Sequence, residues 1–178
     1  MPAARSLKAR ALQWLAQREQ SRVELRRKLL RQAHAELAAA TEVDSASEAH
    51  ESVAEQVDAV LDWLESNGYL SAQRFVESRI NARAARYGNL RIRQELQQHQ
   101  LGLPDELAQT LVASEVDRAC AVRARKFAEL PRDAAERARQ ARFLIGRGFS
   151  SEAVRAALRG LSPTDAGEDD ATTAASGT

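Results

Sequence analysis

The sequence predicts an all-α protein. Of its 178 residues, 44% are hydrophobic, which is enough to form a core, whereas only 4% are aromatic. Eight glycines and four prolines are few for the tight turns of a β-sandwich or barrel, and the helix-favouring Ala, Leu, Arg, Glu and Gln dominate. At this length we expect one compact domain or a short array of helical modules.

A helical hairpin is expected in the first part of the chain. Four apolar residues at i, i+4, i+7 and i+8 form one stripe of a helix that ends near Arg18: Leu7, Ala11, Trp14 and Leu15. Ser21 and Glu24 have the S-x-x-E spacing of a capping box, so a second helix starts there. The Ala-rich, acidic residues 34–52 lack a clear apolar stripe. For them we expect a helix extension, a loose loop or both, with part of the stretch disordered.

The middle of the chain is expected to hold three helices. An amphipathic helix covers residues 53–64, and Asn67 and Gly68 end it in a left-handed turn. Ser71 is the candidate cap of the next helix, which runs to about residue 88. Asn89 can cap a short third helix, whose inward apolar residues are Leu90, Ile92 and Leu96.

Four more helices are expected before residue 160. Pro104 opens the first of them, because proline is tolerated at the first helical turn. A helix through residues 116–127 stops before Pro131, since the residue that precedes proline avoids helical geometry. Residues 134–147 form the next helix, and Ser150 or Ser151 caps the last one.

Charge is segregated along the chain. The 26 Lys and Arg nearly cancel the 25 Asp and Glu. However, residues 1–31, 74–99 and 118–159 are basic blocks, and the stretches between and after them are acidic. Residues 161–178 have almost nothing to bury, so we expect a disordered acidic tail there.

Cysteine content and hydropathy favour a cytoplasmic protein. Cys120 is the only cysteine and cannot form an internal disulfide. The sequence has no run of about 18 apolar residues for a membrane span, and its first residues lack the apolar region of a signal peptide. We expect a soluble monomer that makes no membrane contact.

Signatures of catalysis and of metal binding are missing from the sequence. His34, His50 and His99 have no His or Cys at ligand spacing, and one cysteine cannot build a zinc site. The phosphate-binding loop G-x-x-x-x-G-K-[ST] is absent, and Gly146-x-Gly148 fits the end of a helix better than a nucleotide fingerprint. We therefore expect no enzymatic activity, no metal and no cofactor.

Rows of basic side chains carry the clearest functional signal. Arg22 and Arg26 lie one helical turn apart, and Arg79, Arg83 and Arg86 follow one another at i, i+4 and i+7. Such rows can meet a phosphate backbone or an acidic protein groove, although any one of them can also be a solvated face.

The aromatic residues add no nucleic-acid signal. Five are assigned to the core, Trp14, Trp63, Phe75, Phe127 and Phe143, and three to corners between helices, Tyr69, Tyr87 and Phe149.

Similar corners recur along the chain: WLAQREQS from residue 14, WLESNGYL from residue 63 and FLIGRGFS from residue 143. They indicate divergent helical modules. At these corners the chain resembles the bacterial RecX regulatory family, modulators of the RecA recombinase. Four stretches carry the resemblance: ALQWLAQREQSRVELRRKLL from Ala11, VLDWLESNGYLSAQRFVESRINARAARYGNLRIRQEL from Val60, QLGLP from Gln100 and FLIGRGFSSEAVRAAL from Phe143.

The resemblance implies a fold of three tandem three-helix modules in an elongated, curved arrangement. We place the modules at residues 5–68, 69–114 and 115–160. The acidic stretch 34–52 is then an insertion that is longer than the usual connection in the family. Three corner glycines are expected to shape the modules: Gly68, Gly88 and Gly148.

The resemblance also implies a function, that of a negative regulator of RecA. Such a protein binds the RecA filament on single-stranded DNA, blocks filament extension and the ATPase, strand-exchange and coprotease activities, and promotes disassembly. It thereby regulates DNA repair and the SOS response. The implied partners are the RecA filament and single-stranded DNA, with double-stranded DNA as a further candidate. Nine basic positions in matching motifs are candidates for contact with filament or DNA: Arg18, Arg26, Lys28, Arg74, Arg79, Arg83, Arg91, Arg93 and Arg147.

Two functions of other classes stay open. A DNA-binding protein that acts independently of a recombinase would bind naked DNA with a strong dependence on salt, because each neutralised phosphate releases counterions. A generic helical scaffold for some other protein would bind neither the filament nor DNA.

Overall fold

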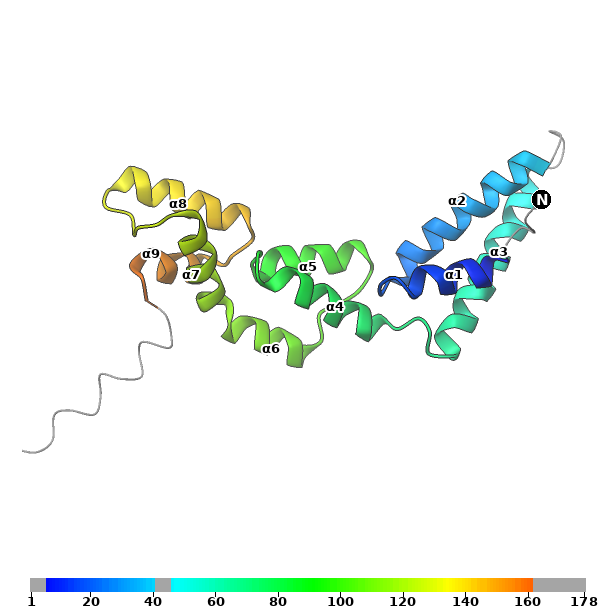
Figure 1. Cartoon of the computed structure of the whole chain (residues 1–178), viewed down its shortest axis with the longest axis horizontal. Coiled ribbons are helices and arrows are strands. Elements are labelled where there is room, and N and C mark those ends of the chain that lie inside the picture. The colour runs from blue at the N-terminus through cyan, green and yellow to red at the C-terminus, as the bar shows by residue number, and fades with distance from the viewer. Residues whose placement is uncertain (1–5, 41–45, 162–178) are drawn as a thin grey trace, which may run out of the picture. The chain divides into compact units, whose positions relative to one another are not determined.

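The structure, a computed structural model, describes residues 6–40 and 46–161, and within these ranges it contains nine α-helices and no strand (Figure 1). The predicted all-α class is therefore confirmed. The helices are α1 (Leu7–Leu15), α2 (Arg22–Ala40), α3 (Ala46–Ser66), α4 (Ala72–Ala84), α5 (Asn89–Gln98), α6 (Asp105–Ala113), α7 (Glu115–Lys126), α8 (Ala134–Gly146) and α9 (Ser151–Arg159). The expected acidic tail lies outside the described residues except for Leu161.

The contacts within the chain define two compact units. The first holds the residues up to Ser78 together with His99–Leu101, and the second holds Arg79–Gln98 and the residues from Gly102 on. Helix α4 contributes to both units. The boundaries of the three expected modules stay a prediction.

The first unit is built on α1, α2 and α3, which pack against one another. Its core consists of seven buried residues: Ala11, Leu25, Leu29, Val57, Leu61, Leu64 and Leu70. Full burial of one such leucine contributes about 1.5–3 kcal/mol to stability. At the end of α3, Gly68 adopts the left-handed conformation that the sequence predicts, with a φ of 72°.

The helix boundaries of the first unit differ from those expected. Helix α1 ends at Leu15 and not near Arg18, because the chain must turn there to bury Gln20 and Ser21 at the start of α2. Helix α2 runs to Ala40 and α3 begins at Ala46. Most of the acidic stretch 34–52 is therefore helical, and its residues 41–45 lie outside the described part.

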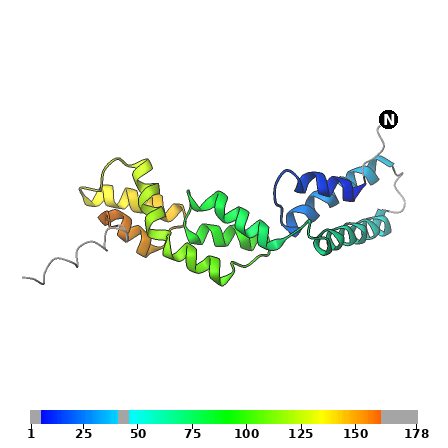
Figure 2. The same ribbon diagram turned by 60° about the horizontal axis from the view of Figure 1, so that its bottom comes forward.

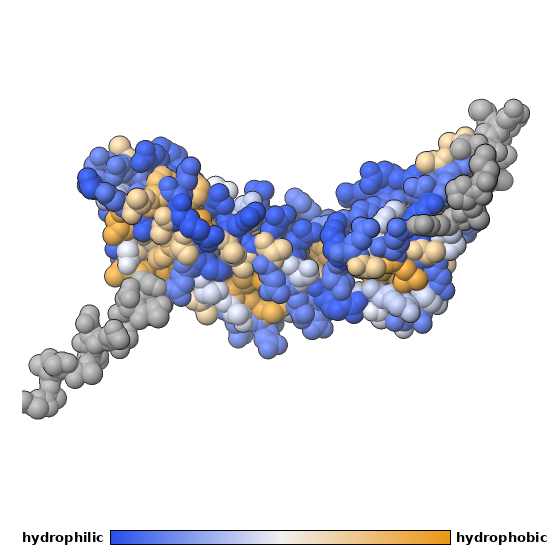
Figure 3. Space-filling view, in the orientation of Figure 1, coloured by the Kyte–Doolittle hydropathy of each residue, from blue (hydrophilic) through white to orange (hydrophobic). Residues whose placement is uncertain are grey.

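The second unit has its core where α7, α8 and α9 meet, and these helices form one group in both ribbon views (Figure 1, Figure 2). The buried residues are Ala119, Val122, Leu144, Phe149, Ala153, Val154, Ala157 and Leu158. Figure 3 shows hydrophilic residues over much of α8 and hydrophobic residues beside α7 and α9. Ser150 caps α9 as predicted, since its hydroxyl accepts from the Ala153 amide at 3.2 Å.

Two expectations for the second unit are wrong. Leu90 is 58% exposed, because α5 turns only Ile92 and Leu96 inward. Asn89 is the first residue of α5 and is buried, and its side chain bonds to other helices instead of capping its own. The expected stop before Pro131 is confirmed, because α7 ends at Lys126 and Phe127 is already extended.

The aromatic residues are less buried than expected. Only Phe75 of the five assigned to the core is fully buried, and Trp14, Trp63, Phe127 and Phe143 are half-buried. Among the corner residues, Phe149 belongs to the core of the second unit. Large rings at the edge of so small a core keep one side open, and that side is available to cations.

Candidate nucleic-acid interface

The nine candidate contact residues fall into two groups, one in each unit. The first unit holds Arg18, Arg26, Lys28 and Arg74, and the second holds Arg79, Arg83, Arg91, Arg93 and Arg147. The two groups differ in how far carboxylates neutralise them.

Helix α3 supplies acids to the basic side of α2. The Arg26 guanidinium donates to both carboxylate oxygens of Asp58, at 2.7 and 2.9 Å. Arg22, one turn earlier, pairs with Asp62 at 2.7 Å and with Glu65 at 2.6 Å. The hydrogen bonds from Arg26 hold the pKa of Asp58 below its ordinary value, so this pair is charged at neutral pH. The acids of α3 therefore already occupy this basic row.

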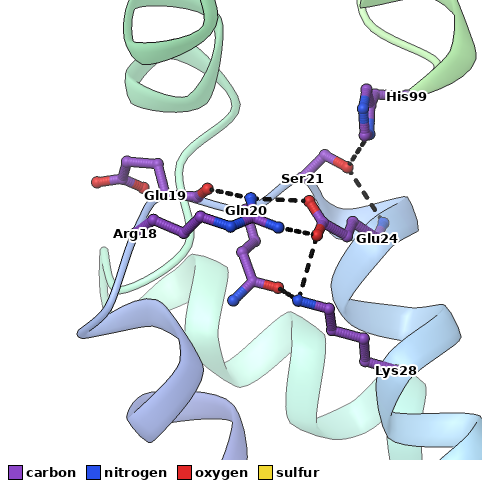
Figure 4. A network of polar contacts seen from close by, with 7 residues as sticks. All are labelled: Arg18, Glu19, Gln20, Ser21, Glu24, Lys28 and His99. Atoms are coloured by element: carbon purple, nitrogen blue, oxygen red, sulfur yellow. Dashed lines mark hydrogen bonds and ion pairs between the residues drawn. The ribbon is translucent and has the colours of Figure 1, made fainter. Parts of the chain in front are cut away.

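A second polar network, at the corner before α2, involves the other three basic candidates of the first unit, and Figure 4 shows two of them, Arg18 and Lys28. Glu24 accepts from Arg18, and its carboxylate lies 3.2 Å from the Lys28 ammonium. Arg74 pairs with Glu19 at 2.7 Å. The Glu24 carboxylate thus binds side chains, whereas the capping box predicted that it reaches back to the Ser21 amide.

Ser21 and His99 form a pair that resembles a nucleophile and its base, with 2.7 Å between the hydroxyl oxygen and Nδ1 (Figure 4). The hydroxyl also accepts from the Glu24 amide at 3.1 Å, as the capping box predicts. Ser21 is 1% exposed, and the His99 ring lies 4.8 Å from the ring of Phe75. A substrate cannot reach this hydroxyl, so the pair anchors residue 99 to the start of α2.

In the second unit, carboxylates bind fewer of the candidate residues. Arg83 pairs with Glu95 at 2.9 Å, and Arg91 lies 3.8 Å from the same carboxylate. Arg79 is half-buried on α4, and Arg93 is exposed on α5. One carboxylate therefore serves two arginines, and the unit keeps an excess of positive charge.

Three guanidinium groups surround the aromatic ring of Tyr87. Arg83, Arg91 and Arg147 lie 5.7, 5.5 and 5.7 Å from its ring centroid. This is within the range at which a cation is attracted to the face of an aromatic ring. Three predicted contact residues, from α4, α5 and the corner after α8, are thus brought together around one tyrosine.

A basic hollow of about 360 Å³ opens beside this tyrosine. Four of its eight lining residues are cations, none is acidic, and two are aromatic: Ala85, Arg86, Tyr87, Val122, Arg125, Lys126, Phe143 and Arg147. We use the name basic hollow for this set of residues. Its volume lies within the range of about 300–1,000 Å³ that is typical of ligand sites.

The end of α4 orients two of the cations in the basic hollow. Arg125 donates to the carbonyl of Ala85 at 2.7 Å, and Arg147 donates to the carbonyl of Arg86 at 3.1 Å. The carbonyl groups at the C-terminal end of a helix carry partial negative charge, which attracts cations. These two guanidinium groups are therefore held in place without a carboxylate.

Arg118 completes this set of contacts from a more buried position. It donates to the carbonyl of Tyr87 at 2.9 Å and to that of Leu111 at 2.9 Å, and reaches Ala84 at 3.3 Å. Burial lowers the pKa of Arg118, and the charge of Glu115 acts in the opposite direction. Arg118 is a structural cation that joins α7 to the ends of α4 and α6.

The sequence did not single out Arg118, Arg125 or Lys126, although all three lie in a basic block. Their positions depend on contacts between α7 and the residues that follow α4, more than 30 positions earlier in the chain. Helical periodicity carries no information on such contacts. The segregation of charge was the only available signal.

The described residues hold neither a candidate metal centre nor a candidate membrane-spanning helix. No group of three or more His, Cys, Asp or Glu side chains there could hold a metal ion. No helix among them is both long and apolar enough to cross a membrane.

The comparisons with known proteins agree with the all-helical architecture. A family model described as the third three-helix domain of RecX matches residues 113–158. A protein of Ralstonia pickettii named Regulatory protein RecX is 45% identical over 157 residues, which is 87% of each chain. Proteins of the same name from Ralstonia nicotianae and Herminiimonas arsenicoxydans are 46% and 44% identical, over 87% and 86% of this chain and 87% and 91% of their own lengths.

Proposed function

The chain belongs to the RecX family of regulatory proteins, and from that premise we propose that it is a non-enzymatic negative regulator of the RecA recombinase. It binds the RecA filament on single-stranded DNA and blocks filament extension. It lowers the ATPase, strand-exchange and coprotease activities and promotes disassembly. In the cytoplasm it thereby regulates DNA repair and the SOS response as a monomer.

One observation carries this proposal, namely the excess of positive charge on the second unit. The basic hollow has four cations and no acidic lining residue, and Arg93 is exposed close in sequence to it. A protein that follows a filament on DNA needs such a surface, because phosphates and acidic protein grooves both attract cations. Three linked modules would add weak contacts into a tighter overall association.

The nine candidate residues contribute unequally under this proposal. Arg83, Arg91, Arg93 and Arg147 of the second unit make the first contacts, since few acids compete for them. Arg18, Arg26, Lys28 and Arg74 are held by acids of their own unit and contact the partner only when those pairs exchange.

A titration into preformed recombinase filaments tests the proposal. ATP hydrolysis and filament length are followed together at two salt concentrations, and we expect both to fall at well below one protein per recombinase monomer. Arg93→Glu should weaken the inhibition. Arg27→Glu is the matched control, because Arg27 is also exposed on a helix but is not among the candidate contacts.

A second candidate function is a DNA-binding protein that acts without a recombinase. The same basic hollow favours it, since phosphate binding needs no protein partner. Unchanged ATPase activity and filament length, with strong and salt-dependent binding to bare DNA, would replace the first proposal by this one. If the chain neither inhibits the recombinase nor binds bare DNA, the remaining hypothesis is a helical scaffold for some other protein.

A further inference from the structure

We infer that the basic hollow is a subsite for consecutive phosphates of a single nucleic-acid strand, and that it reads the phosphate backbone and not the bases. The inference rests on the proposed function, which supplies the strand, namely the single-stranded DNA of the filament. It goes beyond that function because it names the residues of the site, states that they bind phosphate groups and states that they do not recognise the bases.

The donors of the basic hollow suit a phosphodiester. Arg86 and Lys126 are exposed, and the carbonyl groups of Ala85 and Arg86 fix the guanidinium groups of Arg125 and Arg147. Guanidinium groups donate paired hydrogen bonds to phosphate oxygens, and a group that is already oriented loses less entropy on binding. Two flexible cations and two fixed ones can thus hold more than one phosphate.

No acid neutralises the donors from within the basic hollow. Glu95, which pairs with Arg83 and Arg91 beside Tyr87, does not line the hollow. An anion that enters the hollow therefore displaces no carboxylate. In this the basic hollow differs from the row formed by Arg22 and Arg26, whose acids would first have to leave.

The two aromatic rings of the basic hollow are already occupied. Tyr87 has three guanidinium groups within 6 Å of its centroid. The Arg147 guanidinium lies 4.7 Å from the Phe143 centroid, and the Phe127 ring lies at a right angle to Phe143 with its centroid 5.4 Å away. A base that stacked on either ring would have to remove a cation that also serves the phosphate. The rings therefore support the cations, and recognition is independent of sequence.

A flexible single strand fits a hollow better than a duplex does. The phosphates of a single strand can turn inward one after another, whereas a short duplex behaves as a stiff rod. A site of about 360 Å³ with donors on several sides requires such turning. The ligand class is therefore single-stranded nucleic acid.

The test uses the full chain and a fluorescent oligodeoxythymidine, with no recombinase present, and follows binding by anisotropy over a range of salt concentrations. The variant carries Arg86→Gln and Lys126→Gln, which remove two cations whose side chains are exposed and make no described hydrogen bond. We expect about tenfold weaker binding at low salt. The slope of log affinity against log salt should fall by about 1.4, because each phosphate contact on a single strand contributes about 0.7.

A matched control removes the same charge from the same unit. Arg155→Gln with Arg159→Gln alters two exposed arginines on α9, neither of which lines the basic hollow. This control should bind as the unaltered chain does, and circular dichroism should be the same for all three proteins. Equal losses in both variants would mean that binding reflects net charge only, and would overturn the inference.

Three further ligands distinguish what the basic hollow recognises. An abasic strand of the same length should bind within about twofold of oligodeoxythymidine, and a loss beyond about fivefold would show base stacking and refute the inference. A duplex of the same length should bind more weakly, and equal binding would refute the preference for a single strand. Polyphosphate should compete better than polyglutamate of equal charge. The reverse order would assign the hollow to an acidic protein surface.

The outcome does not depend on filament control. A variant that loses oligonucleotide binding but still inhibits the recombinase supports the basic hollow and separates it from the filament contact. A chain that binds the oligonucleotide through the basic hollow but leaves the recombinase unaffected supports the subsite and refutes the proposed function.

Discussion

Gly88 and Gly148 lie backbone to backbone in the second unit. A Cβ atom added to Gly88 would stand 2.2 Å from the carbonyl oxygen of Gly148. The Gly88 amide donates to the carbonyl of Arg147 at 3.0 Å, and the Leu90 amide donates to that of Gly148 at 3.1 Å. The corner before α5 is thus joined directly to the corner before α9, and the same contact places Arg147 beside Tyr87.

Gly88→Ala should destabilise the second unit, because its Cβ atom would meet backbone that cannot move aside. We expect a loss of about 1–3 kcal/mol in the free energy of unfolding. Gly148→Ala should lower the free energy of unfolding by at least as much. Gly148 has a φ of 81°, and an added Cβ atom would lie 2.6 Å from the Arg91 amide nitrogen. Chemical denaturation followed by circular dichroism measures both.

Gly146→Ala is the control for these two variants. An added Cβ atom meets nothing within 4 Å there, and the residue ends a helix with ordinary φ. Its stability should be unchanged or higher by up to about 1 kcal/mol, because alanine favours a helix over glycine. If all three variants behaved alike, the contact between the two corners would have no energetic importance.

Arg118→Met should lower the free energy of unfolding of the second unit by about 1.5–3 kcal/mol, the usual range for hydrogen bonds to a charged group. The change leaves the Tyr87 carbonyl without its Arg118 donor, and the Leu111 carbonyl keeps only weaker partners such as the Asn89 side-chain amide at 3.1 Å. Hydrogen exchange of the amides in α5 and α7 should accelerate. Arg155→Met, at an exposed position of α9, should leave the exchange rates as they are.

The pair of Arg26 and Asp58 predicts a dependence of stability on pH. The hydrogen bonds from Arg26 hold the pKa of Asp58 below its ordinary value of 3.8, so the pair contributes stability above that value and loses it as the pH falls through the pKa of the folded state. Asp58→Asn should therefore show a smaller fall in Tm between pH 7 and pH 3 than the unaltered chain.

Tryptophan fluorescence reports this transition, because Trp14 and Trp63 both lie in the first unit. The partly exposed pair contributes less than about 1 kcal/mol, so the difference is small and is best measured at low salt. Identical pH profiles would contradict a stabilising role for the pair.

The acids of α3 should compete with external polyanions for α2. We expect that Asp58→Asn with Asp62→Asn and Glu65→Gln frees Arg22 and Arg26 and strengthens binding to oligodeoxythymidine severalfold. The salt slope should grow by about 1.4, because two phosphates are gained.

Removal of three other acids separates this effect from net charge. Glu55→Gln, Asp105→Asn and Glu106→Gln make the same change in charge at exposed positions that have no described ion pair. Their effect on the salt slope should be small. An equal increase in both triple variants would show that Asp58, Asp62 and Glu65 act only through the total charge.

The sequence alone predicted most of the local structure. Apolar periodicity predicted the helices α1 to α9, and Ser71 and Ser150 cap α4 and α9 as expected, because caps and periodicity act over one or two turns. It failed where distant contacts overrule a local preference. Asn89 bonds to Leu111 instead of capping α5, and Leu90 points outward because Ile92 and Leu96 already fill the inner face.

The sequence by itself thus determined the helical class, the recurring corners and the family, since these depend on composition, spacing and motif. Only the tertiary structure decided which cations stay available. Arg22 and Arg26 look as functional in the sequence as Arg86 does, but α3 neutralises them while the basic hollow contains no acid. The physical reason is that the electrostatic field at a side chain depends on its neighbours in space. Folding brings the acids of α3 to Arg22 and Arg26, whereas it brings backbone carbonyl groups to Arg125 and Arg147 of the basic hollow.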